Sequence, residues 1–153
     1  FNGSKEQAAV MVGIGESAQV VSQYMGSPMQ SWGTVSNEDV VWDVIRITAS
    51  DPRAVLAGLN ALMNSSDTKA FPGQIWLVQI LRGQASAAGR VTHEIAVGYE
   101  SMAEMEAWSD KMQTTKAWQT WLGVAGNSFT IANRYNVNWL KAYEHGYTLE
   151  DFE

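Results

Sequence analysis

The 153-residue chain contains no cysteine, and this absence excludes several kinds of chemistry. Disulfides, zinc–thiolate sites, iron–sulfur clusters and thiol catalysis all require cysteine. Uninterrupted apolar runs are only a few residues long, whereas a membrane-spanning helix needs about 20 residues, so the sequence predicts no membrane span. We expect a soluble protein, and the sequence leaves open whether it is cytoplasmic or exported with its signal segment already removed.

Positive charge is also scarce in this chain. Ten Lys and Arg residues are set against sixteen Asp and Glu residues, which gives a net charge of -6. Nucleic-acid binding depends on clustered Lys and Arg side chains that neutralise phosphates, and here the basic residues are spread singly along the chain. The sequence therefore argues against a nucleic-acid partner.

The middle of the chain predicts a strand, a helix and a second strand. Residues 40–48 are rich in β-branched side chains and too short for a typical helix. Asp51 suits a helix N-cap and Pro52 a first helical position, and apolar residues then recur at helical spacing. A second predicted strand covers residues 74–82.

The same order of elements repeats in the second half. Residues 91–99 predict a strand, and Ser101 with Glu104 forms a capping box for a helix that we expect to end at Gly123 and Gly126. Residues 128–137 predict the last strand, with alternating side chains. The doubled β-α-β-β-α-β unit predicts a ferredoxin-like α+β fold, in which two helices cover one face of a four-stranded antiparallel sheet.

The predicted strands are apolar on both faces. In the first strand, Val41 and Ile45 alternate with Trp42 and Val44. One face meets the helices, and the other also needs cover, because a large exposed apolar patch marks an interface. A second copy of the sheet would cover it in a symmetric homodimer or higher oligomer. Residues 1–39 or the C-terminal tail would be an internal alternative, and both explanations remain open.

Three segments carry a resemblance to a known family: Tyr99-Glu100-Ser101, residues 103–108 and residues 114–122. Over residues 40–139 the chain resembles the dimeric α/β-barrel superfamily, especially its antibiotic-biosynthesis-monooxygenase-like and stress-responsive members. The resemblance implies a dimeric barrel that oxygenates aromatic or quinol substrates without a cofactor, degrades haem, or binds a small molecule. Asn133, Trp76 and His93 do not align in the order that haem-degrading relatives use, so we expect no cofactor.

Two histidines were considered for metal binding or catalysis. His93 and Glu94 are neighbours in a strand and point to opposite faces, so they cannot share a metal or a proton. His145 lies beside Glu144 in the tail, and no set of three or four convergent ligands is visible, so we expect no metal. His93 is either a buried structural histidine or a general base, for which its ordinary pKa near 6.5 is suited.

Several strand residues are candidates for a ligand pocket. A buried charge is costly unless it is paired, so polar side chains inside apolar strands predict either an ion-paired pocket for an anionic or carbonyl-bearing ligand or a structural network. Asp43 could pair with Arg46 only if a bulge altered the alternation of the strand. The candidate ligand-binding residues are Trp42, Arg46, Trp76, Gln79, Glu94, Asn133 and Arg134.

The first 39 residues lie outside the doubled unit. Residues 13–18 match G-x-G-x-x-A after an apolar stretch, as in dinucleotide-binding folds. No acidic residue ends the following strand and no parallel repeats follow, so we expect an extra strand at 10–12 and a helix at 16–25 instead. A loop at 26–33 then leads to the main domain. We expect an extension (1–39), the barrel domain (40–139) and an acidic aromatic tail (140–153).

Two functional hypotheses follow. The first is a small-molecule-binding protein with a pocket between sheet and helices for an apolar or aromatic ligand. Its enzymatic form is a cofactor-independent monooxygenase acting on an aromatic substrate, with His93 as base and Arg46 or Arg134 stabilising the anion. The second is a non-catalytic interaction or assembly protein that uses the aromatic sheet face, the extension and the tail for subunit contacts. The sequence leaves open whether the chain is an enzyme.

Overall fold

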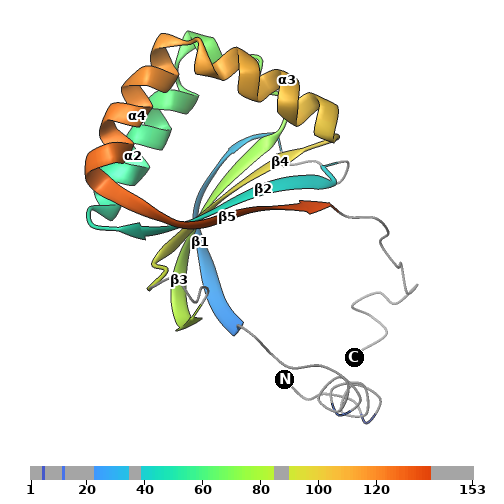
Figure 1. Ribbon diagram of the computed structural model, residues 1–153, viewed down its shortest axis with the longest axis vertical. Coiled ribbons are helices and arrows are strands. Elements are labelled where there is room, and N and C mark those ends of the chain that lie inside the picture. The colour runs from blue at the N-terminus through green and yellow to red at the C-terminus, as the bar shows by residue number, and fades with distance from the viewer. Residues whose placement is uncertain (1–4, 6–11, 13–22, 35–38, 85–89, 139–153) are drawn as a thin grey trace.

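The computed structural model describes residues 5, 12, 23–34, 39–84 and 90–138. Its elements in chain order are β1 (Gln23–Gly33), β2 (Val41–Ala49), α2 (Pro52–Met63), the short 3-10 helix η1 (Ser66–Thr68), β3 (Gln74–Gln84), β4 (His93–Tyr99), α3 (Met102–Gln113), α4 (Lys116–Ser128) and β5 (Phe129–Asn138). The strands form one antiparallel sheet in the order β1-β3-β4-β2-β5, and the helices cover one face of it (Figure 1). The order β3-β4-β2-β5 is that of a ferredoxin-like repeat, so the predicted α+β fold is confirmed, and β1 adds a fifth strand beside β3.

The predicted helix starts are confirmed by their caps. Asp51 Oδ1 accepts hydrogen bonds from the backbone N–H groups of Arg53 and Ala54, each at 3.1 Å, and Pro52 occupies the first helical turn. Ser101 Oγ accepts from the N–H of Glu104 at 3.2 Å. These bonds satisfy N–H groups that have no partner within the helix.

The second predicted helix is in fact two helices. α3 ends at Thr114 and α4 begins after Thr115, whose hydroxyl accepts from Trp118 N at 3.2 Å and donates to Met112 O at 2.8 Å. A threonine that caps a new helix in this way competes with continuation of the old one. The prediction that Gly123 and Gly126 end the helix was wrong, because α4 runs through both to Ser128.

The strand β1 corrects another prediction, since residues 26–33 were expected to form a loop. β1 pairs along its length with β3 and has register shifts next to Gly26 and between Pro28 and Gln30. Pro28 is tolerated because β1 lies at the edge of the sheet, where one side of the strand needs no ladder bonds. Long-range pairing therefore overrides the local turn propensity of glycine, serine and proline.

The remaining predictions for the N-terminal region and the tail are mostly outside the described residues. Residues 23–25 belong to β1 rather than to the predicted helix at 16–25, and Val12 is helical rather than part of a strand at 10–12. The glycine motif at 13–18 and the tail at 140–153 lie outside the described ranges. No helix in the described part of the chain is long and apolar enough to cross a membrane.

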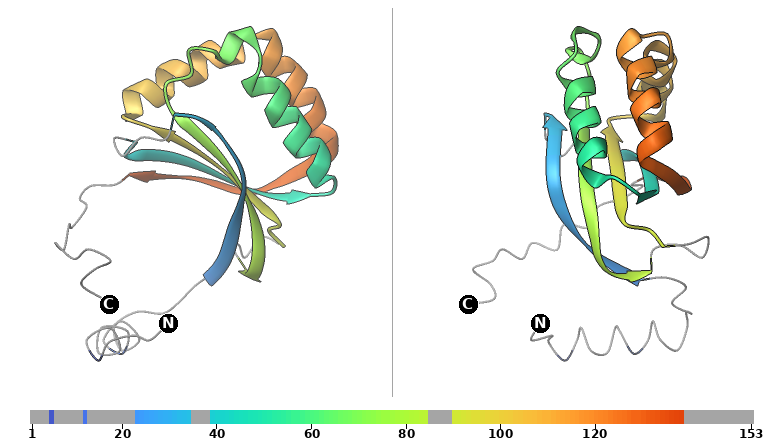
Figure 2. Two further views of the ribbon diagram at one scale, coloured as in Figure 1. Left: turned by 180° about the vertical axis from the view of Figure 1, so that it is seen from behind. Right: turned by 90° about the vertical axis from the view of Figure 1, so that its left-hand side faces the viewer.

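The hydrophobic core lies between the sheet and the paired helices α2 and α4, which lie side by side (Figure 2). Ile47 and Leu77 are fully buried from the strands, and Val55 and Leu59 face them from α2. Burial of each such side chain contributes about 1.5–3 kcal/mol. α3 contributes only one buried residue, Met112, so it packs far less closely than α2 and α4.

Two helical glycines separate the effects of packing and helix propensity. A Cβ on Gly58 would lie 2.8 Å from Cζ3 of the buried Trp121 ring, whereas a Cβ on Gly123 would meet nothing within 4 Å. We expect Gly123→Ala to raise the free energy of unfolding by up to about 1 kcal/mol, because alanine favours the helix. Gly58→Ala should lower it by about 1–3 kcal/mol through overpacking. Urea denaturation measures both values, and equal shifts in the same direction would contradict this account of the α2–α4 contact.

Candidate functional site

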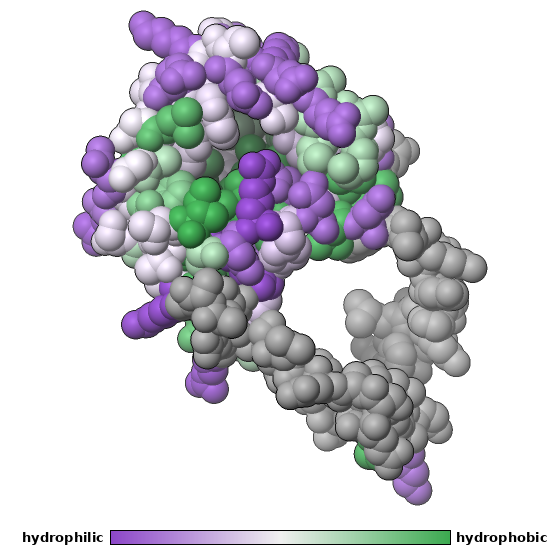
Figure 3. Space-filling model, in the orientation of Figure 1, coloured by the Kyte–Doolittle hydropathy of each residue, from purple (hydrophilic) through white to green (hydrophobic). Residues whose placement is uncertain are grey.

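A cavity of about 940 Å³ lies between α3, α4 and the helix-covered face of the sheet. Figure 3 shows a hollow on this side of the molecule, with hydrophobic side chains beside it and hydrophilic ones around the outside. The cavity exists because α3 crosses the sheet without packing closely on it, and its floor is formed by β2, β4 and β5. A cavity of this size is ample for a small organic ligand.

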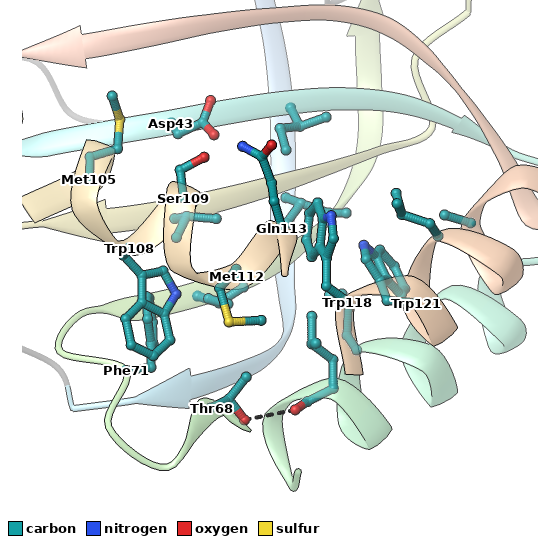
Figure 4. Close-up of a pocket in the computed structure, with 18 of the residues that line it drawn as sticks. Asp43, Thr68, Phe71, Met105, Trp108, Ser109, Met112, Gln113, Trp118 and Trp121 are labelled. Carbon is teal, nitrogen blue, oxygen red and sulfur yellow. Dashed lines mark hydrogen bonds between the residues drawn. The ribbon is translucent and has the colours of Figure 1, made fainter. Parts of the chain in front are cut away.

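Aromatic rings and thioethers form most of the cavity wall. Figure 4 shows the labelled side chains gathered between the helices and the sheet. The Phe71 and Trp108 rings lie 5.3 Å apart, and the Lys111 ammonium lies 4.5 Å from the Trp108 ring centre. The aromatic and thioether side chains of the wall are those of Met63, Phe71, Tyr99, Met105, Trp108, Met112, Trp118, Trp121 and Phe129.

An ion pair, Asp43–Arg134, lies on the floor of the cavity. Arg134 Nε donates to Asp43 Oδ1 at 2.8 Å, and its Nη2 donates to Oδ2 at 2.6 Å. The Asp43 side chain is 7% exposed, whereas that of Arg134 is 57% exposed and reaches the outside. The paired hydrogen bonds raise the pKa of Arg134, so it stays charged.

A β-bulge in β5 brings Arg134 to this face. Arg46 pairs with Asn133, but the next residue of β2, Ile47, pairs with Ile131, so Ala132 is an extra residue. The extra residue reverses the alternation of β5 after this point. Arg134 therefore faces the helices together with Asp43, while the simple alternation expected from the sequence would have placed it on the other face.

Tyr99 adds a polar group to the cavity beside this ion pair. Its side chain is buried at 6% exposure, its ring meets Phe71 edge to face at 5.9 Å, and within the described residues its hydroxyl makes no hydrogen bond. Burial raises the pKa of Tyr99, and the negative charge of Asp43 adds to the effect. The hydroxyl is therefore protonated at all ordinary pH values and can both donate to and accept from a ligand.

The other face of the sheet carries a separate polar cluster, which Arg46, Glu94, Tyr24 and Tyr135 form. Arg46 Nε donates to Glu94 Oε2 at 3.0 Å, and the Tyr24 hydroxyl donates to the same oxygen at 2.8 Å. The Arg46 guanidinium lies between the two tyrosine rings, 4.6 Å and 4.8 Å from their centres. Arg46 and Glu94, two of the candidate ligand-binding residues from the sequence, are paired because they are direct partners across β2 and β4.

Two further candidate residues from the sequence, Asn133 and Gln79, lie outside the cavity on different strands. Asn133 lies on β5 opposite Arg46, and its buried Oδ1 has no hydrogen-bond partner in the described part of the chain. Gln79 is exposed on β3. Neither residue lines the cavity.

Trp42 and Trp76 also lie away from the cavity, on the face without helices. Trp76 Nε1 donates to Gln74 Oε1 at 2.8 Å, and Gln74 Nε2 donates to Asp39 Oδ2 at 2.7 Å. Trp42 Nε1 donates to Asp39 O at 3.2 Å. Both indole N–H groups are therefore engaged within the protein.

His93 is buried at 4% exposure and does not line the cavity. Its Nδ1 lies 2.9 Å from Thr92 Oγ1, and burial lowers its pKa. Its neighbour Glu94 points to the opposite face, as expected from strand geometry. Within the described ranges, no group of three or more His, Asp and Glu side chains could hold a metal ion.

Sequence reasoning missed most of the cavity residues. The helical spacing of Trp108 and Met112 is typical of side chains that pack on a sheet, but α3 stands off the sheet and leaves space beneath them. From the sequence, Asp43 could pair with Arg46 only if a bulge altered the alternation of β2, and in the structure Asp43 pairs with Arg134. The alternation of β2 already placed Asp43 on the opposite face from Arg46, and that signal could have suggested two separate polar sites.

The burial of His93 predicts how the free energy of unfolding depends on pH. Because its pKa in the folded protein is below that in the unfolded chain, the unfolded state binds more protons as the pH falls through about 6.5. Neutral His93 makes its full contribution to the free energy of unfolding above this pH, and that contribution is lost below it. We expect His93→Gln to lose less stability than the wild type between about pH 7.5 and about pH 5, measured by urea denaturation. Equal losses in the two proteins would show that His93 does not titrate in this way.

Comparisons with known proteins give the fold and little more. No protein-family model matches the chain, and no curated protein matches it. A solved structure of an anthrone oxidase-like protein is similar, with a TM-score of 0.54 and 12% identity, and the match covers 90% of this chain and 62% of that one. A major regulator of staphylococcal pathogenesis gives a TM-score of 0.48 and 14% identity over 81% of this chain and 74% of that one, which is too low to support an argument. The similarity to the anthrone oxidase-like protein, with the strand order above, supports a ferredoxin-like α+β fold.

Proposed function

We propose that this chain binds a small aromatic molecule in the cavity between α3, α4 and the sheet. The proposal is carried by one observation, a cavity of about 940 Å³ with many aromatic side chains in its wall, to which Tyr99 presents a hydroxyl that has no hydrogen-bond partner in the described part of the chain. Ligand sites are typically apolar hollows with a few polar groups that fix the orientation of the ligand. Here Tyr99 and the Asp43–Arg134 pair are those groups.

The enzymatic form of this proposal is a cofactor-independent monooxygenase. Its substrate would lose a proton inside the cavity, so the base has to line the cavity. Asp43 does so, and Arg134, which is bound to it, would stabilise the resulting anion. His93, the base that the sequence suggests, would need a substrate placed outside this cavity. The anthrone oxidase-like neighbour makes anthrone a reasonable first probe for both binding and turnover.

Anthrone binding tests the proposal directly. We expect anthrone to quench the fluorescence of the cavity tryptophans in a saturable way, because Trp108, Trp118 and Trp121 surround the site. Ser109→Phe, which fills the cavity from α3, should weaken binding roughly tenfold or more. Ala107→Phe adds the same ring at an exposed position of α3 that does not line the cavity, and it should bind as the wild type does.

Two results would contradict this proposal. One is the absence of saturable binding for both anthrone and 9-anthracenemethanol up to their solubility limits. The other is equal loss of binding in Ser109→Phe and Ala107→Phe. Oxygen consumption with anthrone, measured in the same samples, separates the enzymatic form from binding alone, since turnover should be lost in Asp43→Asn.

We also propose that a second copy of the chain covers the face without helices. Strand alternation places apolar side chains of β2, β3 and β4 on this face, together with the Arg46–Glu94 pair. The apolar members are Trp42, Val44, Trp76, Val78, Ile80 and Ala96. Most of them are half-buried in the single chain, and a self-complementary apolar face is the usual basis of a symmetric dimer. The assembly hypothesis from the sequence uses the same face without requiring a ligand.

A charged residue introduced at the centre of this face tests whether the face forms the dimer interface. We expect native mass spectrometry of the wild type at micromolar concentration to show a dimer, and Ala96→Glu to shift it to the monomer, because an unpaired carboxylate would be buried. Ala103→Glu on α3 introduces the same charge at an exposed position and should leave the dimer intact. A monomeric wild type under these conditions would contradict the proposal.

A further inference from the structure

The charges that line the cavity are unequal. Among the described lining residues, three carboxylates, from Asp43, Glu106 and Asp110, are set against the guanidinium of Arg134, and the Lys111 ammonium lies nearby against the Trp108 ring. Arg134 is already bound by both oxygens of Asp43, so these two charges neutralise each other. Glu106 and Asp110 have no ion-pair partner in the described part of the chain, and they lie four residues apart on α3, on one side of the helix. The cavity therefore has an excess of negative charge at its α3 side.

Tyr99, which lines the cavity, has a raised pKa to which nearby negative charge contributes. Burial is the main cause of its raised pKa, and the anions Asp43 and Glu104 raise it further, while Arg134 alone lowers it. The raised pKa shows that the surroundings of the Tyr99 hydroxyl disfavour negative charge, first because they are buried and then because they are near carboxylates. The hydroxyl can accept a hydrogen bond from a cationic N–H group, because a phenol oxygen retains its lone pairs.

The aromatic wall favours the same sign of ligand charge. The faces of tryptophan, tyrosine and phenylalanine carry a negative quadrupole that attracts ammonium groups, most strongly where water is excluded. The Lys111 ammonium already lies over the Trp108 ring, 4.5 Å from its centre, so the other aromatic rings of the wall are the ones available to a ligand cation. The thioethers of Met105 and Met112 add polarisable surface. The protein as a whole, with a net charge of -6, also attracts cations over longer distances.

From these observations we infer that the cavity is a site for hydrophobic organic cations, such as an aromatic molecule with a protonated or quaternary amine. The inference rests on the proposed binding function and specifies its ligand class. It also reverses the expectation, drawn from the sequence, that strand arginines would select an anionic ligand. An oxygenase that acts through a substrate anion would work against this charge distribution.

Three probes with the same ring system and different charge test the inference. They are (anthracen-9-ylmethyl)trimethylammonium, neutral 9-anthracenemethanol and anthracene-9-carboxylate, each titrated into the full chain with tryptophan fluorescence and calorimetry as readouts. We expect the cation to bind roughly tenfold more tightly than the alcohol, and the carboxylate roughly tenfold more weakly. The preference should shrink at high salt, because the exposed carboxylates on α3 are screened.

Variants that remove carboxylate charges test whether the carboxylates of α3 cause the preference for a cation. Glu106→Gln combined with Asp110→Asn changes only exposed side chains and should reduce the affinity for the cation by roughly three- to tenfold while leaving the affinity for the alcohol unchanged. Glu100→Gln removes an exposed carboxylate that does not line the cavity and should change neither affinity. Equal loss of cation affinity in the double variant and in Glu100→Gln would assign the preference to overall charge and overturn the inference.

The outcomes separate this inference from the proposed function. If none of the three probes binds, the cavity is not a site for aromatic ligands and both proposals fail. If the neutral alcohol binds and the cation is no tighter, or the carboxylate is the tightest of the three, the charge preference is overturned while the binding function stands.

Discussion

The alternation of side chains along β2 divides the polar residues of the sheet between its two faces. Asp43 points into the cavity and Arg46, three residues later, points to the other side. Each charge then needs a partner on its own face, because an unpaired buried charge is costly. Glu94 meets Arg46 directly across the β2–β4 ladder, whereas Arg134 reaches Asp43 only through the extra residue in β5. The ion pair on the cavity floor and the polar cluster on the opposite face both follow from this division.

The cavity results from the different packing of the three helices on the sheet. α2 and α4 bury a close-packed core with β2, β3 and β4, in which Gly58 lets the Trp121 ring approach the α2 backbone. α3 is joined to this body at the Thr114–Thr115 junction and contributes one buried side chain. Its inward aromatic and thioether groups therefore face open space, where a ligand can supply the contacts that the sheet does not. α2 and α4 therefore contribute both to the core and to the cavity wall, whereas α3 contributes mainly to the cavity wall.

Much of the fold could be predicted from the sequence because its signals are local. Apolar β-branched runs marked β2 and β3, and Asp51 and Ser101 marked the starts of α2 and α3. The strand β1 could not be predicted in this way, because its glycine and proline residues favour turns and only pairing with β3 makes it a strand. The sequence indicates Arg46, Glu94 and Arg134 as candidates for one polar site, but it cannot show that Arg134 lies on the opposite face from the other two, because a single-residue bulge leaves no local signal in the sequence. The cavity could not be predicted because it depends on the height of α3 above the sheet, which is a property of tertiary packing.

The bulge in β5, which turns Arg134 toward the helices, also affects the edge of the sheet. β5 is the last strand in the order, so one row of its backbone amides and carbonyls has no neighbouring strand among the described residues. A regular strand in that position is a template on which another chain can pair and start an aggregate. The extra residue at Ala132 bends the strand and interrupts the regular spacing of its hydrogen-bonding groups. The irregularity that turns a guanidinium toward the helices therefore also makes this border a poor place for sheet growth, and a variant with the bulge deleted would lose both properties at once.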